Sequence, residues 1–231
     1  MKIERAEWDS KFFNLKVGRC QLADENSLDS SLLANWDLIY FFVAPENIDS
    51  ISILEKCGAY CVDRKVTYAR QVIPNLEAKN HTLRSYTSSA FDSDLIELGI
   101  EAGQYSRFKI DPRISQSQFS ALFTAWVNRS ISREFADEVL VTTAGETKIT
   151  GLITLNRKEE TAQIGLLAVN PLSRGLGIGK NLVAGANVYA QSNSCKHLEV
   201  TTQEDNVNAG RFYEGVGFTR KDTNLIYHYW K

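Results

Sequence analysis

The first part of the chain alternates between strand-like and helix-like patterns of hydrophobic and polar positions. Residues 37–43 form an apolar run rich in aromatic and branched side chains, which predicts a strand buried on both faces. A helical segment ends near residue 56, and an extended segment follows over residues 62–72. The polar stretch 74–80 then interrupts the pattern. We therefore predict a domain boundary there, after a smaller N-terminal α/β domain over residues 1–78.

The second part, residues 79–231, predicts a mixed sheet with helices on both faces. Strands are expected near residues 81–86, 138–143, 149–155, 161–169, 196–202 and 225–230, and helices near residues 93–103, 116–133, 175–191 and 206–217. This order predicts an α/β (α+β) fold, in which a mixed central sheet is flanked by helices. Its chemistry is expected where a strand leads into a helix at the open end of the sheet.

Composition places the chain among ordinary globular proteins and narrows its partners. Of 231 residues, 43% are hydrophobic and 23% are charged, and 26 basic against 28 acidic side chains give a net charge of −2. A near-neutral chain lacks the basic field of a dedicated nucleic-acid binder. No apolar run reaches the ~18 residues that a membrane-spanning helix needs, and no signal peptide is visible. We therefore expect a cytoplasmic protein without nucleic-acid partners or membrane insertion.

The cysteines and histidines do not predict a metal site. Their spacing matches no zinc-ligand pattern, since the histidines lie far from the cysteine pair 57 and 61 in sequence. We expect reduced, structural thiols and no metal. These residues are Cys20, Cys57, Cys61, Cys195, His81, His197 and His228.

The most informative stretch is the glycine-rich turn over residues 174–179, between an apolar strand and an amphipathic helix. Glycines at a helix start let backbone N–H groups approach a phosphate, which the helix N-terminus favours. A nucleotide-triphosphatase loop is excluded because Arg174 replaces its first glycine and Asn181 its hydroxyl residue. A dinucleotide fingerprint is excluded because Lys180 stands in place of its third glycine.

The turn instead fits Arg-x-x-Gly-x-Gly, and it resembles the pyrophosphate-binding signature of the GCN5-related N-acetyltransferase (GNAT) family. A second segment, residues 206–218, is similar to a later helix of that family. The matching positions are Asn206, Ala209, Tyr213, Gly217 and Phe218. The resemblance covers roughly residues 81–231 and implies a GNAT acetyltransferase domain over residues 79–231.

The resemblance implies acetyl-CoA as co-substrate. Its pyrophosphate would bind the glycine turn, and its pantetheine arm would pair with the preceding strand. The implied binding residues are Leu167, Ala168, Val169, Arg174, Gly175, Leu176, Gly177, Ile178, Gly179, Lys180, Asn206 and Ala209. Helical spacing alone favours Tyr213 as a core aromatic, whereas the resemblance implies an acid that protonates the leaving thiolate.

A narrower resemblance links the whole chain to one branch of this family, the bacterial dTDP-4-amino-4,6-dideoxygalactose (dTDP-fucosamine) acetyltransferases of surface-polysaccharide synthesis. The matching residues are Trp8, Asp9, Phe12, Phe13, Ser106, Arg107, Phe108, Trp126, residues 164–167 and the C-terminal Tyr-Trp pair. This branch implies a nucleotide-linked amino sugar as the acceptor, with the N-terminal domain on the acceptor side. Because Cys195 lies beyond the helix and does not match a nucleophile position, we expect direct transfer in a ternary complex.

The branch also implies Asp63 as general base, whereas residues 63–65 alone would equally suit a solvated charged turn. The basic loop of Arg107, Lys109 and Arg113 could receive the acceptor diphosphate or be solvated, and the resemblance supports Arg107 as the ligand. The chain departs from the branch over residues 109–113.

Two other functions stay open. The same fold acetylates other amines, such as a small metabolite or a protein N-terminus, and a non-catalytic acyl-CoA-binding module would share the glycine turn. The aromatic C-terminal strand could also pair with the edge of a second copy in a homodimer.

Overall fold

The computed structural model describes residues 2–22, 30–78, 83–87, 92–145 and 147–231. Its strands are β1 (Glu4–Arg5), β2 (Val17–Leu22), β3 (Leu38–Val43), β4 (Tyr60–Gln71), β5 (Leu83–Ser85), β6 (Glu138–Ala144), β7 (Lys148–Lys158), β8 (Thr161–Val169), β9 (His197–Gln203) and β10 (Thr219–Trp230). Its helices are α1 (Glu7–Phe13), α2 (Ser30–Leu33), α3 (Ile48–Lys56), α4 (Ser93–Ala102), α5 (Arg107–Ile110), α6 (Gln116–Ile131), α7 (Ile178–Ser192) and α8 (Val207–Gly215), with a 3-10 turn, η1 (Pro171–Ser173).

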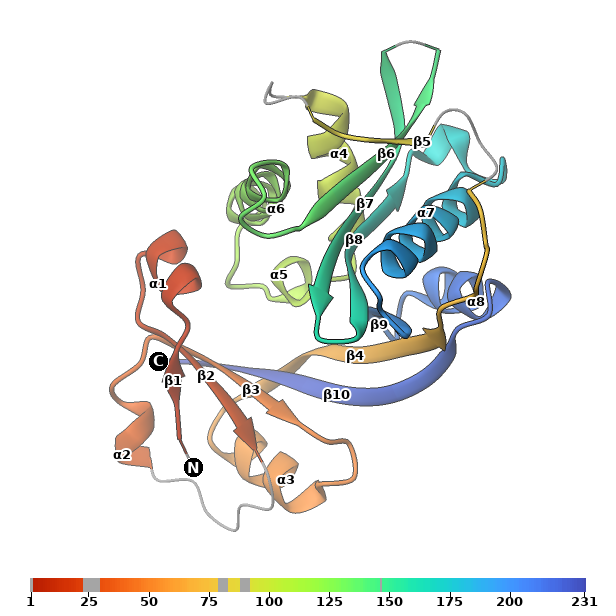
Figure 1. Ribbon diagram of the computed structural model, residues 1–231. Helices are drawn as coiled ribbons and strands as arrows, with labels where there is room; N and C mark the ends of the chain where they lie inside the picture. Colours follow the sequence, from red (N-terminus) through yellow and green to blue (C-terminus); the bar gives the residue numbers. More distant parts are fainter. Residues whose placement is uncertain (1, 23–29, 79–82, 88–91, 146) are drawn as a thin grey trace.

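These strands form one mixed sheet in the order β1-β2-β3-β10-β4-β9-β8-β7-β6-β5. Only the β2–β3 and β8–β9 pairs are parallel among the described strands. The long strands β4 and β10 run across the middle of the molecule and join its upper and lower parts (Figure 1). The structure thus confirms the α/β prediction of a mixed central sheet flanked by helices.

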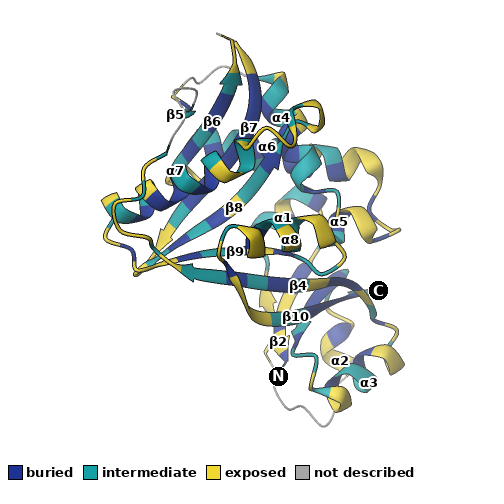
Figure 2. Cartoon of the chain, turned by 90° about the vertical axis from the view of Figure 1, so that its right-hand side faces the viewer, coloured by how far each residue is buried: buried dark blue, intermediate teal, exposed yellow. Residues whose placement is uncertain are grey.

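The helices cover both faces of the sheet and form its core. On one face, α4 packs over β7 and β8 and α6 packs against α4 and β6, while α7 lies on the other face of β7 and β8. The capping box at Ser115 and Gln118 fixes the start of α6, since each side chain accepts the other residue's backbone N–H. Buried residues gather along the strands, and exposed ones along the outer sides of the helices (Figure 2).

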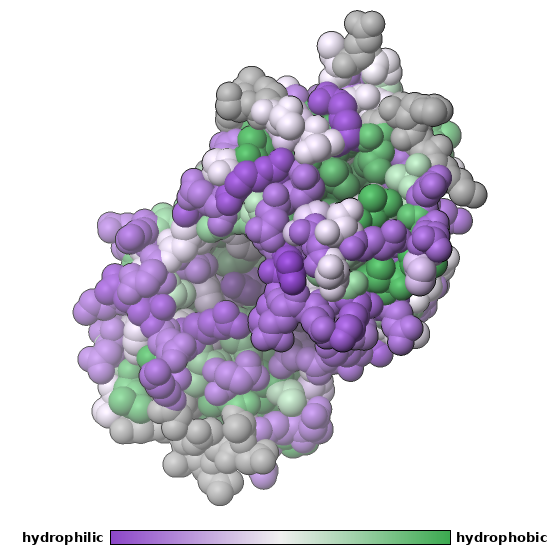
Figure 3. All heavy atoms as spheres, in the orientation of Figure 1, coloured by the Kyte–Doolittle hydropathy of each residue, from purple (hydrophilic) through white to green (hydrophobic). Residues whose placement is uncertain are grey.

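The predicted domain boundary falls between β4 and β5, and residues 79–82 lie outside the described ranges. Strands from both sides of this boundary interlock, because β4 pairs with β9 and β10 pairs with β3. A hollow bordered by hydrophilic residues lies between the upper and lower parts of the molecule (Figure 3). The division into domains at residues 78 and 79 stays a prediction.

The C-terminal strand does not offer the edge that the homodimer prediction assumed. Residues 225–228 of β10 pair with β3 on one side and with β4 on the other, so this stretch lies inside the sheet. That part of the prediction is wrong because the strand order was not visible in the sequence. The homodimer itself stays a prediction.

Most predicted elements are present, with differences at their ends. The helix expected from residue 175 begins at Ile178, after η1 and a turn, and the strand expected at 225–230 extends back to Thr219. Of the strand expected at residues 81–86, residues 81 and 82 lie outside the described ranges. In the part of the chain that the structure describes, no helix is long and apolar enough to cross a membrane.

Candidate active site

Strands β8 and β9 separate and open a cavity between them. Their parallel pairing ends at Ile164 and Val200, although both strands continue. Beyond this point, the edge of β8 that faces β9 is unpaired over residues 165–169. A cavity of about 820 Å³ lies there, lined by β8, β9, α8, the start of α7 and the segment from α4 to α6. The free strand edge can accept an extended ligand as an additional strand.

The glycine turn presents unpaired backbone N–H groups to this cavity. Gly175 and Gly177 have φ angles of +80° and +79°, which glycine adopts without strain. Gly177 caps α7 without a side-chain hydrogen bond, so the first N–H groups of this 15-residue helix are not capped by a side chain. Ile178, Gly179 and Lys180 line the cavity at that point. The partial positive charge of the helix N-terminus favours an anion at this position, which we call the anion site.

Arg174 is held beside the turn by two contacts. Its Nη2 lies 2.6 Å from Glu101 Oε1, and its Nε donates to the Val169 carbonyl over 3.3 Å. Both ionic side chains are partly exposed, so the pair contributes little to stability. Its effect is to hold a guanidinium at the mouth of the anion site.

Helix α8 brings Tyr213 to the wall of the same cavity. Tyr213 is buried, and its ring packs against those of Tyr68, Phe212 and Phe218. No hydrogen bond joins its hydroxyl to any described residue, and burial raises its pKa. Asn206 accepts from the Ala209 N–H and so caps the helix. The hydroxyl of Tyr213 thus keeps its proton at neutral pH and is available to a ligand.

Asp63 also lines the cavity, with a carboxylate that lacks a hydrogen-bond partner in the described structure. It is only 6% exposed, and neither carboxylate oxygen has a hydrogen-bond partner among the described residues. Burial raises its pKa, while the charges of Lys65 and Arg107 oppose the rise. The nearby side chain of Gln203 opposes it weakly. Since a buried polar group without a partner is costly, this carboxylate is arranged for a ligand or water.

Lys65 is a site residue that the sequence analysis missed. It follows Asp63 by two positions on β4, so both side chains lie on the same face of the sheet and both line the cavity. Burial, and next the charge of Arg107, lower the pKa of Lys65 to about 8, against the opposing charge of Asp63. The period of two along the strand is the signal that would have found it.

Arg107 lines the cavity and lies against aromatic rings. Its Cζ is 4.6 Å from the ring centre of Tyr40 and 4.4 Å from that of Phe108. Its Nε and the neighbouring Ser106 Oγ are buried without a hydrogen-bond partner in the described structure. Lys109 and Arg113, in contrast, lie over Phe119 and Trp230 and do not line the cavity. Of these three basic residues, only Arg107 therefore lines the cavity.

Asp111 anchors helix α5 to the sheet. Its carboxylate accepts from Tyr60 Oη over 2.8 Å and from Trp230 Nε1 over 2.9 Å, and it lies 2.5 Å from His228 Nδ1. Burial acts to raise the pKa of Asp111, but these hydrogen bonds lower it to about 2. Burial lowers the pKa of His228 to about 4, so its imidazole is neutral near pH 7. The network fixes α5, and with it Arg107, against β10.

The structure brings almost all predicted site residues together. The two predicted catalytic residues, Arg107, and all but one of the predicted cofactor residues line this cavity. The exception is Leu176, which is 76% exposed and does not line it. Among the described residues, no group of three or more His, Cys, Asp or Glu could hold a metal ion.

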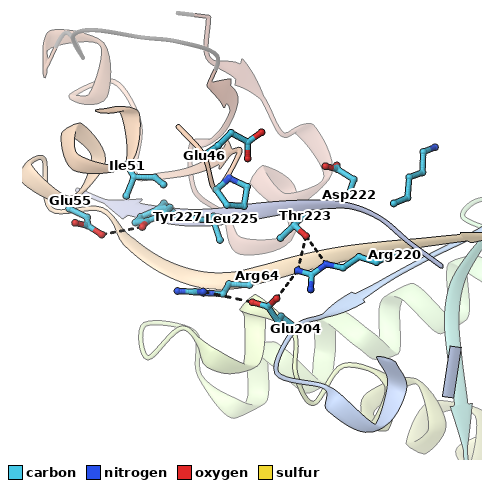
Figure 4. Close-up of a pocket in the computed structure, with 12 residues that line it drawn as sticks. Glu46, Ile51, Glu55, Arg64, Glu204, Arg220, Asp222, Thr223, Leu225 and Tyr227 are labelled. Carbon is cyan, nitrogen blue, oxygen red and sulfur yellow. Dashed lines mark hydrogen bonds and ion pairs between the residues drawn. The ribbon is translucent and has the colours of Figure 1, made fainter. Parts of the chain in front are cut away.

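A second cavity, of about 810 Å³, lies over β4 and β10, and polar side chains that line it pair with one another (Figure 4). Its Glu204 pairs with Arg220 over 2.6 Å and with Arg64 over 3.8 Å, and Tyr227 donates to Glu55. None of its described lining atoms is a buried polar group without a partner. Within the described ranges, buried polar groups without a partner thus line the first cavity and not the second.

The fold and this cavity agree with three comparisons. The sequence profile of the Acetyltransferase (GNAT) family matches residues 106–218. The spore coat polysaccharide biosynthesis protein SpsD of Bacillus subtilis (strain 168) is 30% identical over 138 residues, 59% of this chain and 46% of that protein. The N-alpha-acetyltransferase 30 of Saccharomyces cerevisiae is 38% identical over 65 residues, 28% of this chain and 37% of that protein.

Solved structures show the same fold. The crystal structure of a GCN5-related N-acetyltransferase from Sphaerobacter thermophilus superposes with a TM-score of 0.54 at 15% identity, over 84% of this chain and 59% of that one. Residues 106–218 thus form a GNAT acetyltransferase domain. The chain spans less than half the length of the two curated relatives that it matches.

Proposed function

We propose that this protein transfers the acetyl group of acetyl-CoA to the 4-amino group of a nucleotide-linked amino sugar, a dTDP-4-amino-4,6-dideoxyhexose, in surface-polysaccharide synthesis. The observation that carries the proposal is one cavity that is lined by the N-terminus of α7, by Tyr213 and by the unpartnered carboxylate of Asp63. The likeness to SpsD, whose name assigns it to spore coat polysaccharide biosynthesis, supports a sugar acceptor.

The chain's own residues can bind acetyl-CoA and divide the proton transfers. The glycine turn holds the pyrophosphate, and the free edge of β8 holds the pantetheine arm. Acetyl-CoA supplies an activated thioester. Asp63 accepts the proton of the acceptor amine, directly or through one water, and the hydroxyl of Tyr213 gives a proton to the departing thiolate.

Direct transfer in a ternary complex fits the positions of the cysteines. Cys195 is buried in the core cluster of α7 and β9, and no cysteine is among the described residues that line the cavity. A thiol nucleophile that would carry the acetyl group is therefore not in reach among these residues. The amine attacks the thioester carbonyl, a C–N bond forms, and the C–S bond breaks.

The proposal is tested by measuring coenzyme A release from acetyl-CoA with a panel of acceptors. The panel holds dTDP-4-amino-4,6-dideoxygalactose, its gluco epimer, a peptide with a free N-terminus and a simple primary amine. We expect fast release with one sugar epimer. No release with either sugar, from protein that still binds acetyl-CoA, would reject the sugar acceptor, and release with the peptide alone would assign a protein N-terminus instead.

Gly177→Ala is expected to raise the KM for acetyl-CoA about tenfold or more with a smaller change in kcat. Alanine is strained at a φ of +79°, so the substitution is expected to shift the turn whose N–H groups hold the pyrophosphate. Gly58→Ala is the matched control, because Gly58 has a φ of +86°, an equally open Cβ position and no place in the cavity. An equal KM for acetyl-CoA in both variants would contradict pyrophosphate binding by the turn.

A further inference from the structure

Three cationic side chains lie near one another on one side of the sheet. Lys65 and Arg107 line the cavity, whereas the exposed Arg19 is not among its lining residues. Arg19 on β2 has its Cζ 4.5 Å from the ring centre of Phe42, and Arg107 has its Cζ 5.9 Å from the same ring. Lys65 comes from β4, on the other side of β10. The charges of Arg19 and Arg107 both act on Lys65. We name Arg19, Lys65 and Arg107 the cation cluster.

The strand register places the cluster on one face of the sheet. Phe42 on β3 pairs with Ile226 on β10, which pairs with Asp63 on β4. Directly paired residues in neighbouring strands share a face, about 5 Å apart per strand. Arg19 and Lys65 therefore face the same space over Phe42, Ile226 and Asp63, and Arg107 closes it from α5.

The cation cluster lacks the ion pairs that other cations of this chain form. In the described part of the chain, no carboxylate oxygen lies within 4.0 Å of a charged nitrogen of Arg19, Lys65 or Arg107. By comparison, Arg64, the neighbour of Lys65 on the opposite face of β4, is paired with Glu204.

Only partial compensation comes from the acids that face the cluster. Asp9 and Asp63 interact with it at longer range, and burial raises the pKa of both. Arg107 also has a buried Nε without a partner, next to the unpartnered Ser106 Oγ. Cationic donors and an unpartnered hydroxyl over aromatic rings are the chemistry that binds a diphosphate and a nucleotide base.

We propose that the cation cluster of Arg19, Lys65 and Arg107 binds the diphosphate of the nucleotide-linked acceptor, an inference that rests on the proposed function. This diphosphate site is separate from the anion site of the glycine turn, because it is formed by β2, β4 and α5 and not by the N-terminus of α7. Arg19 and Lys65 are then specificity residues that select a phosphorylated acceptor over a simple amine.

The test measures binding of dTDP by calorimetry to protein saturated with coenzyme A, which blocks the glycine turn. Arg19→Gln and Lys65→Gln are each expected to weaken dTDP binding about tenfold to a hundredfold, the effect of losing one charge-assisted contact. Arg64→Gln is the matched control and should bind dTDP like the parent protein. Each variant should bind thymidine, which has no phosphate, with the affinity of the parent protein. The binding of inorganic pyrophosphate should be weakened in the same variants as the binding of dTDP.

Unchanged dTDP affinity in Arg19→Gln and Lys65→Gln would overturn the inference, as would an equal loss in Arg64→Gln. Coenzyme A affinity and the thermal unfolding midpoint show whether each variant is folded.

The experiments distinguish failure of the diphosphate site from failure of the proposed function. If dTDP binding depends on the cluster but no amino sugar is acetylated, the diphosphate site stands and the proposed function fails. If the sugar is acetylated but substitutions in the cation cluster leave the affinity for dTDP unchanged, only the present inference fails.

Discussion

Tyr213→Phe is expected to lower kcat about 100-fold or more while the KM for acetyl-CoA stays within about twofold. The hydroxyl lines the cavity without a partner among the described residues, and burial keeps it protonated. Phenylalanine retains the ring that packs against Phe212 and Phe218, so binding and folding should persist. Initial rates over a range of acetyl-CoA concentrations separate the two constants.

Tyr68→Phe is the control for this variant. Its ring centre is 5.9 Å from that of Tyr213 in the same core cluster, but Tyr68 does not line the cavity. The Tyr68→Phe variant should have the same kcat as the parent protein. An unchanged kcat in Tyr213→Phe would end the acid role, and equal losses in both variants would indicate a packing effect.

Asp63→Asn is expected to lower kcat about 100-fold or more, because the amide cannot accept the proton of the amine. The parent protein should lose kcat/KM toward acid pH, as the carboxylate is protonated with a pKa above the usual aspartate range. The kcat/KM of the variant should not show this decrease toward acid pH, which is the acid limb of the profile. Asp222→Asn, an exposed carboxylate of the second cavity, should retain both the rate and the limb. A parent-like pH profile in Asp63→Asn would assign the base elsewhere.

The same substitution is expected to stabilise the fold at alkaline pH. Because the folded-state pKa of Asp63 is raised, the folded protein binds this proton more tightly than the unfolded chain. Stability therefore falls as the pH rises through that pKa, and the ionised carboxylate costs free energy above it. The thermal midpoint of Asp63→Asn should exceed that of the parent at alkaline pH, and the difference should shrink toward acid pH. A lower midpoint at alkaline pH would contradict the buried, uncompensated carboxylate.

Local features of the site could be predicted from the sequence. The glycine turn and the helix after it are adjacent in the chain, and positive φ at Gly175 and Gly177 requires no distant partner. The strand before the turn and helix α8 have clear periodicity of their own. Their meeting in one cavity was expected from the family resemblance and from the α/β order, and the structure places them there.

Features that depend on strand order could not be predicted. The pairing of β10 with β3 joins residues 225–230 to residues 38–43, and no local pattern encodes this register. Arg19 was missed because β2 was not recognised as a strand, although buried and exposed positions alternate over residues 18–22, with Arg19 exposed. The hydrogen bonds of Asp111 with His228 and Trp230 join residues 117 and 119 positions apart, so their role in fixing α5 appears only in the folded chain.

The most direct test of the central claim is to identify the product by mass spectrometry. The protein would be incubated with acetyl-CoA deuterated in the acetyl group and with dTDP-4-amino-4,6-dideoxygalactose or its gluco epimer. We expect one epimer to gain the mass of one deuterated acetyl group, with fragments that place it on the sugar nitrogen. Label on neither sugar, or label that remains on the protein and is not passed on, would contradict direct transfer to a nucleotide-linked amino sugar.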